Sequence, residues 1–157
     1  MKKFFLFPLM VLATLIALPA CSDDDKEKFP PETPETPVAT TYTGRLTVNG
    51  GAYIKEDADC EITFAESGDK LTLNINSVKF AEAMPVTINL SVPEIPCATE
   101  DGKTIFSGND IVPMMGVAPA EAYTFSAITG SIENSVLEFS ATLTKGSFSF
   151  TGVEKQQ

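Results

Sequence analysis

The chain has 157 residues, a formal net charge of −10, and neither histidine nor tryptophan. Phosphate binding needs clustered Lys and Arg, so this acidic balance argues against a nucleic-acid partner. The absence of histidine excludes every Ser-His-Asp and Cys-His catalytic arrangement and removes the commonest metal ligand. We therefore expect no enzyme, no metal site and no cofactor.

Residues 1–20 have the pattern of a secretory signal peptide. Two lysines precede an apolar run of about 14 residues, which is short of the ~20 that a bilayer-spanning helix needs. The run ends at Leu18-Pro19-Ala20-Cys21, which resembles a bacterial lipobox. This resemblance implies cleavage before Cys21 and a mature chain anchored through lipid on that residue. The alternative is an ordinary cleavage site with an incidental cysteine.

An acidic run, Ser22-Asp23-Asp24-Asp25, directly follows the predicted lipid site. It resembles the export signal of Bacteroidetes-type lipoproteins, which implies an outer-membrane anchor that faces the cell surface. The alternative is a solvated acidic spacer. With the Pro/Glu/Thr residues that follow, residues 21–39 form a predicted disordered tether, because its prolines remove backbone donors and keep the chain extended.

After residue 39 the sequence changes to the alternation of apolar and polar residues that is typical of half-buried strands. The first predicted strand covers 40–48, and strands over 59–64 and 71–75 follow as a hairpin. The apolar phase slips at Asn76-Ser77, which indicates a bulge or a strand end. A strand over 86–92 is expected to stop at Pro93 and Pro96, because proline cannot donate to a ladder.

The remaining residues continue the pattern, with predicted strands over 104–107, 123–130 and 137–143 and a last strand that buries Phe148 and Phe150. Residues 111–122 are apolar but irregular. We interpret them as a buried connection, with a loop packed over an opening as the alternative. A polar tail, 154–157, ends the chain.

Two cysteines remain besides Cys21. In an oxidising compartment, Cys60 and Cys97 are a candidate disulfide that would close a loop of 38 residues (97 − 60 + 1). The chain-entropy model gives such a loop up to roughly 4 kcal/mol. Two free thiols are the alternative. A cysteine pair without histidine is a poor zinc site, and the spacing is not that of a redox motif.

About eight short strands and no convincing helix predict an all-β antiparallel sandwich or barrel. The opening Tyr42-Thr43-Gly44-Arg45-Leu46-Thr47-Val48 and the later Ile128-Thr129-Gly130-Ser131-Ile132 and Leu137-Glu138-Phe139 are similar to calycin-like domains of Bacteroidetes-type surface lipoproteins. The resemblance implies an eight-stranded, lipocalin-like meander barrel over residues 40–153. It carries over no functional residue, and the Gly-x-Trp motif of lipocalins is absent.

We expect an outer-membrane lipoprotein whose barrel binds a small apolar or lipid-like ligand. The candidate barrel lining is Phe64, Phe106, Met114, Met115, Tyr123, Phe125, Phe139, Phe148 and Phe150. Alternating aromatic residues also fill ordinary β-cores. The alternative is therefore a side-chain-filled barrel that contacts a protein or glycan partner through its outer face or loops.

An enzyme would have to use adjacent acidic residues, such as Glu56/Asp57 or Glu100/Asp101. Carboxylate catalysis needs two groups held apart in a cleft, whereas adjacent acids in turns are nearly always solvated.

Overall fold

The computed structural model describes residues 38–156 of the chain. The predicted signal peptide, Cys21, the acidic run 22–25 and nearly all of the tether lie outside the described residues.

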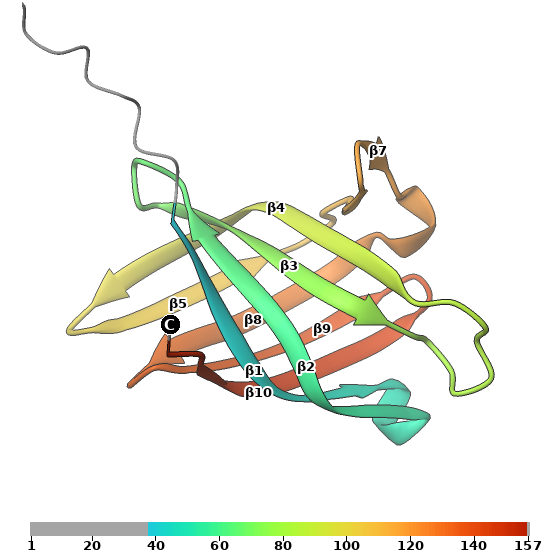
Figure 1. The fold of residues 1–157 in the computed structure, drawn as a ribbon. Coiled ribbons are helices and arrows are strands. Elements are labelled where there is room, and N and C mark those ends of the chain that lie inside the picture. The colour runs from blue at the N-terminus through green and yellow to red at the C-terminus, as the bar shows by residue number, and fades with distance from the viewer. Residues whose placement is uncertain (1–37, 157) are drawn as a thin grey trace, which may run out of the picture. The chain divides into compact units, whose positions relative to one another are not determined.

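The described chain consists of β-strands with two short 3₁₀-helices (Figure 1). The elements are β1 (Ala39–Val48), η1 (Asn49–Gly51), β2 (Tyr53–Phe64), β3 (Lys70–Val78), β4 (Ile88–Glu100), β5 (Lys103–Gly108), β6 (Met114–Met115), β7 (Ala118–Pro119), η2 (Glu121–Tyr123), β8 (Phe125–Glu133), β9 (Val136–Leu143) and β10 (Gly146–Glu154). No helix among residues 38–156 has the length and apolar character needed to cross a membrane.

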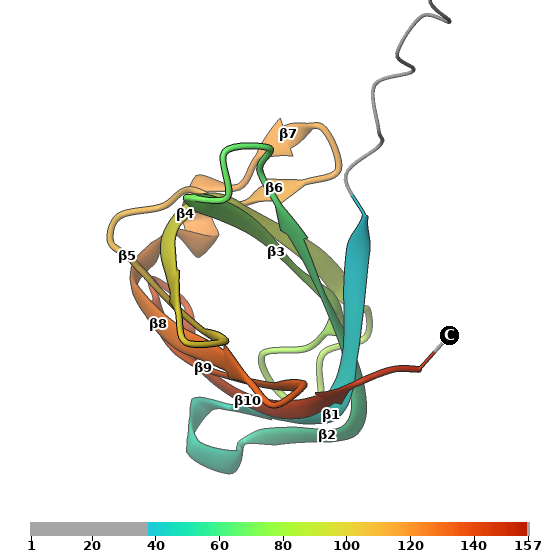
Figure 2. The same cartoon turned by 90° about the vertical axis from the view of Figure 1, so that its left-hand side faces the viewer.

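Eight of these strands form one closed antiparallel barrel. Each strand from β1 to β4 pairs with the next, β5 pairs with β8, and β8, β9 and β10 follow in order until β10 returns to β1. Figure 2 shows the strands as a ring. Closure pairs the sheet edges that otherwise invite aggregation. The predicted all-β, eight-stranded meander barrel is confirmed.

Alternate residues of the long strands point into the barrel and form one apolar core. On β3, Leu71, Leu73 and Ile75 are buried in strict alternation and Val78 is buried beyond the register shift, and β9 buries four residues in the same alternation. Gly44 of β1 faces Gly152 of β10. A Cβ on Gly44 would overlap the carbonyl oxygen of Thr151 and the Cα of Gly152, so the close approach requires glycine.

Strand β4 continues through Pro93 and Pro96, so the prediction that these prolines end the strand is wrong. Val92 lies opposite Leu73 and Ile95 lies opposite Leu71, so three residue steps on β4 match two on β3. The extra residue forms a β-bulge, in which Glu94 has a φ of 53°. Beyond the bulge, β4 continues and pairs with β5 from Cys97 to Glu100. The phase slip predicted at Asn76-Ser77 is confirmed as a second register shift against β4.

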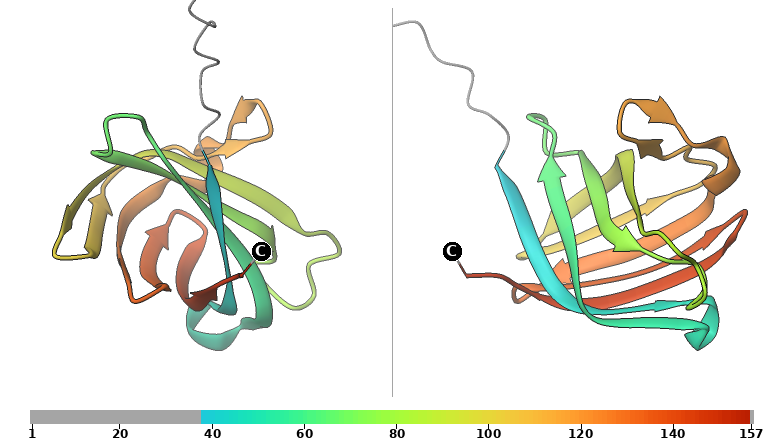
Figure 3. Two further views of the ribbon diagram at one scale, coloured as in Figure 1. Left: turned by 60° about the vertical axis from the view of Figure 1, so that its left-hand side comes forward. Right: turned by 45° about the vertical axis from the view of Figure 1, so that its right-hand side comes forward.

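Residues 111–124 leave the barrel wall between β5 and β8 as an excursion that contains β6, β7 and η2 (Figure 3). Its base is a bridge between Ile111 and Phe125, and Pro113 is buried beneath it. The tip residue Val117 is 98% exposed. The predicted buried connection is therefore wrong for most of the segment, since only the base is buried and the hairpin projects.

Candidate functional site

The barrel interior, where a ligand was expected, holds aromatic side chains packed on one another. Five of the candidate lining residues point inward from β5, β8, β9 and β10, and each is at most 3% exposed: Phe106, Phe125, Phe139, Phe148 and Phe150. The rings of Phe139 and Phe150 stack with centroids 5.5 Å apart, and those of Phe125 and Phe148 meet edge to face at 6.3 Å. These contacts are favourable in themselves.

The other four candidate lining residues lie at the margins of the core. Phe64, at the end of β2, and Tyr123, in η2, are partly buried against it. Met114 is partly buried, whereas Met115 is 38% exposed. Both methionines belong to the projecting excursion rather than to a barrel strand.

A cluster of three aromatic rings, called the aromatic cap below, packs at one end of the barrel. The sequence analysis did not identify this cluster. Phe80, in the loop between β3 and β4, stacks on Tyr123 at 5.1 Å and contacts Phe148 at 5.2 Å between ring centroids. Asn49 holds the loop in place, because its side-chain amide donates to the carbonyl oxygen of Phe80 and its side-chain oxygen accepts from the backbone N–H of Ser147. The cap joins four segments that are distant in sequence.

The candidate disulfide is not formed, and Cys60 and Cys97 are both free thiols. Cys60 lies opposite Ile75, and Ile75 lies opposite Leu90. Cys97 is seven residues farther along β4 than Leu90 (97 − 90), a separation on the order of 20 Å at the usual rise of a strand. A disulfide requires Cα atoms within about 7 Å, so no local adjustment brings these two residues together.

The outside of the barrel, in contrast, has open depressions. The largest of three adjoining ones, about 680 Å³, lies along the hairpin of β4 and β5 and is called the outer groove below. Pro96, Ala98 and Ile105 give it apolar surface, and Ile105 is 57% exposed there. Its charged residues are Glu100, Asp101, Lys103 and Glu133. Cys97 and Ser107 complete the lining.

Two shallower depressions, of about 470 and 370 Å³, continue the outer groove across β8, β9 and β10. The first shares Lys103 and Ile105 with the outer groove, and the second shares Thr129, Ser140 and Ser149 with the first. A row of hydroxyl side chains crosses five adjacent strands in register on this surface: Thr47, Ser149, Ser140, Thr129 and Ser107. The arrangement offers a continuous contact surface with one apolar, charged-rimmed end.

Charged groups on the described surface are spread out rather than gathered into a catalytic or metal centre. Lys103 and Glu133 form an ion pair at 3.0 Å beside the outer groove, and Arg45 lies 3.6 Å from Glu56. Glu56, Asp57, Glu100 and Asp101 are all exposed. Within residues 38–156, no three His, Cys, Asp or Glu side chains lie together in a metal-binding arrangement.

Comparisons of the chain with protein-family models, with curated proteins and with solved structures found no match. The architecture therefore rests on the strand pairing itself. A closed, all-antiparallel barrel of eight strands is compatible with a calycin-like fold.

Proposed function

We propose that this chain is a surface-exposed, outer-membrane lipoprotein of the Bacteroidetes type that acts as a non-enzymatic binding module through the outside of its barrel. The observation that carries this proposal is the contrast between an apolar core that buries five phenylalanine side chains and an outer groove of about 680 Å³. That contrast favours the filled-barrel hypothesis over a ligand held inside. The anchor rests on Leu18-Pro19-Ala20-Cys21 and the acidic run that follows it.

The outer groove fits a protein partner that presents an apolar side chain flanked by Lys or Arg. Ile105 supplies the apolar contact, and well-packed apolar or aromatic anchors with a polar rim dominate most interfaces. Three acidic residues and one lysine surround the groove, and that lysine is already paired with Glu133. The remaining negative charge matches the acidic chain as a whole and would steer a basic partner.

The anchor is tested by Cys21→Ala in the native host. The variant should move from the detergent-extracted membrane fraction to the soluble fraction, because the only proposed acylation site is gone. Continued extraction by detergent alone would refute lipidation at Cys21. Protease treatment of intact cells checks surface exposure, since an anchor that faces the periplasm would protect the barrel.

The partner surface is tested by photo-crosslinking on intact cells, with a photoreactive residue placed at Ile105 or, as the control, at Val153. Val153 is a suitable control because it is 60% exposed and belongs to none of the three depressions. We expect a discrete adduct from position 105 that disappears when Glu100, Asp101 and Glu133 are changed to Gln or Asn. Equal yields at both positions, or no adduct at 105, would reject the groove as the contact site.

A further inference from the structure

The hairpin of β6 and β7 exposes apolar side chains that the proposed partner surface does not use. Residues 111–120 contain no charged side chain. Val117 is 98% exposed, Met115 38% and Val112 36%. Single exposed apolar residues are common, but three on one projecting segment form a patch, and such patches mark protein or membrane contacts.

The hairpin has a regular, hydrogen-bonded structure. Met114 pairs with Pro119 and Met115 with Ala118, and the backbone N–H of Ala120 donates to the carbonyl oxygen of Pro113 at 2.8 Å. Met114 also pairs with Ser91 of β4, which fixes the hairpin to the barrel wall. Gly116, with a φ of 63°, makes the turn at the tip. The apolar tip is thus held away from the core by the fold.

The hairpin and the start of β1 lie at opposite ends of the barrel, because the base of the hairpin contacts the turn between β9 and β10, whereas Ala39 pairs with Thr63 beside the turn between β2 and β3. Both nevertheless lie on one flank of the barrel, since in Figures 1, 2 and 3, which differ by rotation about the vertical axis, both are in the upper part of each view. Ala39 is the first residue of β1, and Cys21 precedes it by 18 residues (39 − 21). A barrel that lies with this flank against the bilayer therefore brings both the start of β1 and the apolar tip to the membrane.

We propose that the tip of this hairpin, Met115-Gly116-Val117, is a second membrane contact that inserts into the interface of the bilayer holding the lipid anchor. The proposal rests on the proposed anchor at Cys21. The anchor raises the effective concentration of the hairpin at the bilayer, so a contact too weak to recruit the protein by itself can form.

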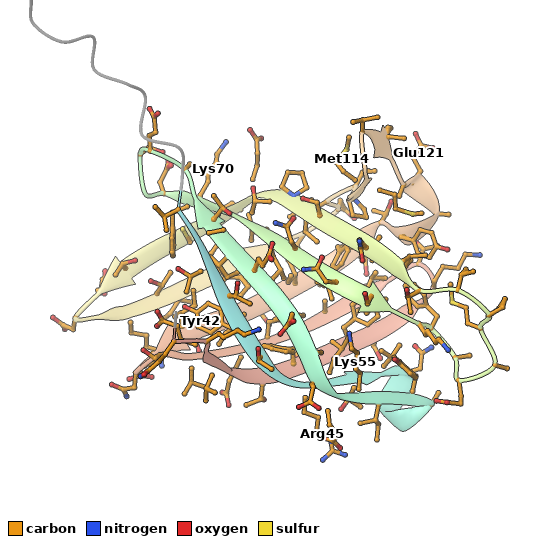
Figure 4. All side chains as sticks on the ribbon, viewed as in Figure 1. Tyr42, Arg45, Lys55, Lys70, Met114 and Glu121 are labelled. Atoms are coloured by element: carbon orange, nitrogen blue, oxygen red, sulfur yellow. The ribbon has the colours of Figure 1, made fainter. Side chains whose placement is uncertain are left out.

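Charge at the base of the hairpin limits the depth of insertion. Asp110 immediately precedes the uncharged segment, and Glu121 immediately follows it. Figure 4 marks Met114 and Glu121 on this excursion. Carboxylates are costly within the hydrocarbon, and hairpin backbone groups need water or headgroup partners, so only the tip enters the interface. The chain has a net charge of −10, so insertion is expected to be weaker on anionic than on zwitterionic lipid.

The sequence contains neither tryptophan nor histidine, so an introduced tryptophan reports only its own environment and a histidine tag is the only histidine-based nickel ligand. The mature chain is made with a histidine tag in place of Cys21 and tethered to phosphatidylcholine vesicles that contain a nickel-chelating lipid. Val117→Trp then supplies the only tryptophan. We expect its emission to shift to the blue on tethering and to be quenched by brominated acyl chains. Val153→Trp, at a position 60% exposed on β10, is the matched control and should show neither effect.

Two outcomes would overturn the proposal. One is unchanged emission of Val117→Trp on tethered vesicles. The other is a blue shift without vesicles that grows with protein concentration, which would assign the tip to a second copy of the chain. Because the tag replaces the lipid, neither outcome depends on acylation of Cys21. Release of Cys21→Ala in cells tests the anchor separately.

Discussion

The two cysteines of the barrel illustrate how far residue environments diverge from sequence expectations. Both cysteines lie on strands, yet Cys60 is fully buried in the core and Cys97 is only partly buried. Burial raises the pKa of the Cys60 thiol to about 12, with nearby Asp59 adding to the effect. The pKa of Cys97 is also raised, by its partial burial and by Asp69. Since the thiolate is the reactive form, neither residue is an activated nucleophile.

We predict that iodoacetamide labels Cys97 in the native protein while Cys60 stays unlabelled until the barrel unfolds. Labelling of Cys97 should increase as the pH rises above 9, because its raised pKa keeps most of it protonated at neutral pH. Cys60 should remain silent over the same range, since its pKa is about 12 and its thiol is inaccessible. Peptide mass mapping with and without guanidinium provides the measurement. A Cys60–Cys97 disulfide in unreduced protein would contradict it.

At the scale of elements, the alternation of apolar and polar residues identified strands well where no extra residue interrupts it. The buried faces of β1, β3, β9 and β10 follow directly from their sequences. Bulges break this inference, because one extra residue reverses the face of the sheet to which every later side chain points. On β8 the extra residue is Ser126, so Ile128 rather than Ala127 shares the buried face with Phe125.

The outer groove and the aromatic cap were missed for a related reason. The groove combines Ala98 of β4, Ile105 of β5 and Glu133 of β8, and these residues meet only through pairing between strands. The cap similarly brings Phe80 to Tyr123 and Phe148. Local patterns predict which face a residue occupies, but the neighbours across strands depend on register, and register depends on the bulges.

The bulge in β4 gives a prediction at this scale. Glu94 has a φ of 53°, a conformation that costs most side chains about 1–2 kcal/mol and costs glycine little. Its ion pair with Lys70 is long, at 3.7 Å, and exposed, so its loss should matter little. We expect Glu94→Gly to raise the free energy of unfolding by about 0.5–1 kcal/mol in urea denaturation.

Ser91→Gly is the control for this substitution. Ser91 lies on the same strand in regular pairing with Asn74, where glycine should lower stability by about 0.5–1 kcal/mol or more. If both glycine variants destabilise the protein equally, the positive φ of Glu94 contributes nothing to the energetics of the bulge.

At the scale of the whole molecule, the main question is whether a barrel of eight strands has room for a ligand. Such a barrel is just wide enough for side chains to fill or for one small molecule to occupy. The difference depends on strand tilt and side-chain volume together, which the sequence pattern does not specify. Here the inward-facing rings contact one another, and Phe80 with Tyr123 covers one end.

A filled core predicts that the mature chain, produced in its own host with Cys21→Ser, gives the mass of the protein without a ligand in native mass spectrometry.

Removing one aromatic ring should create a cavity in the core. Phe139→Ala is expected to cost about 3–5 kcal/mol of stability and to leave a dry apolar cavity that binds benzene, seen as a rise in melting temperature with benzene concentration. Phe139→Leu, a smaller reduction, serves if the alanine variant does not fold. A copurified adduct of the unsubstituted barrel, lost on denaturation, would instead restore the interior-ligand hypothesis, because a molecule could then enter without any ring being removed.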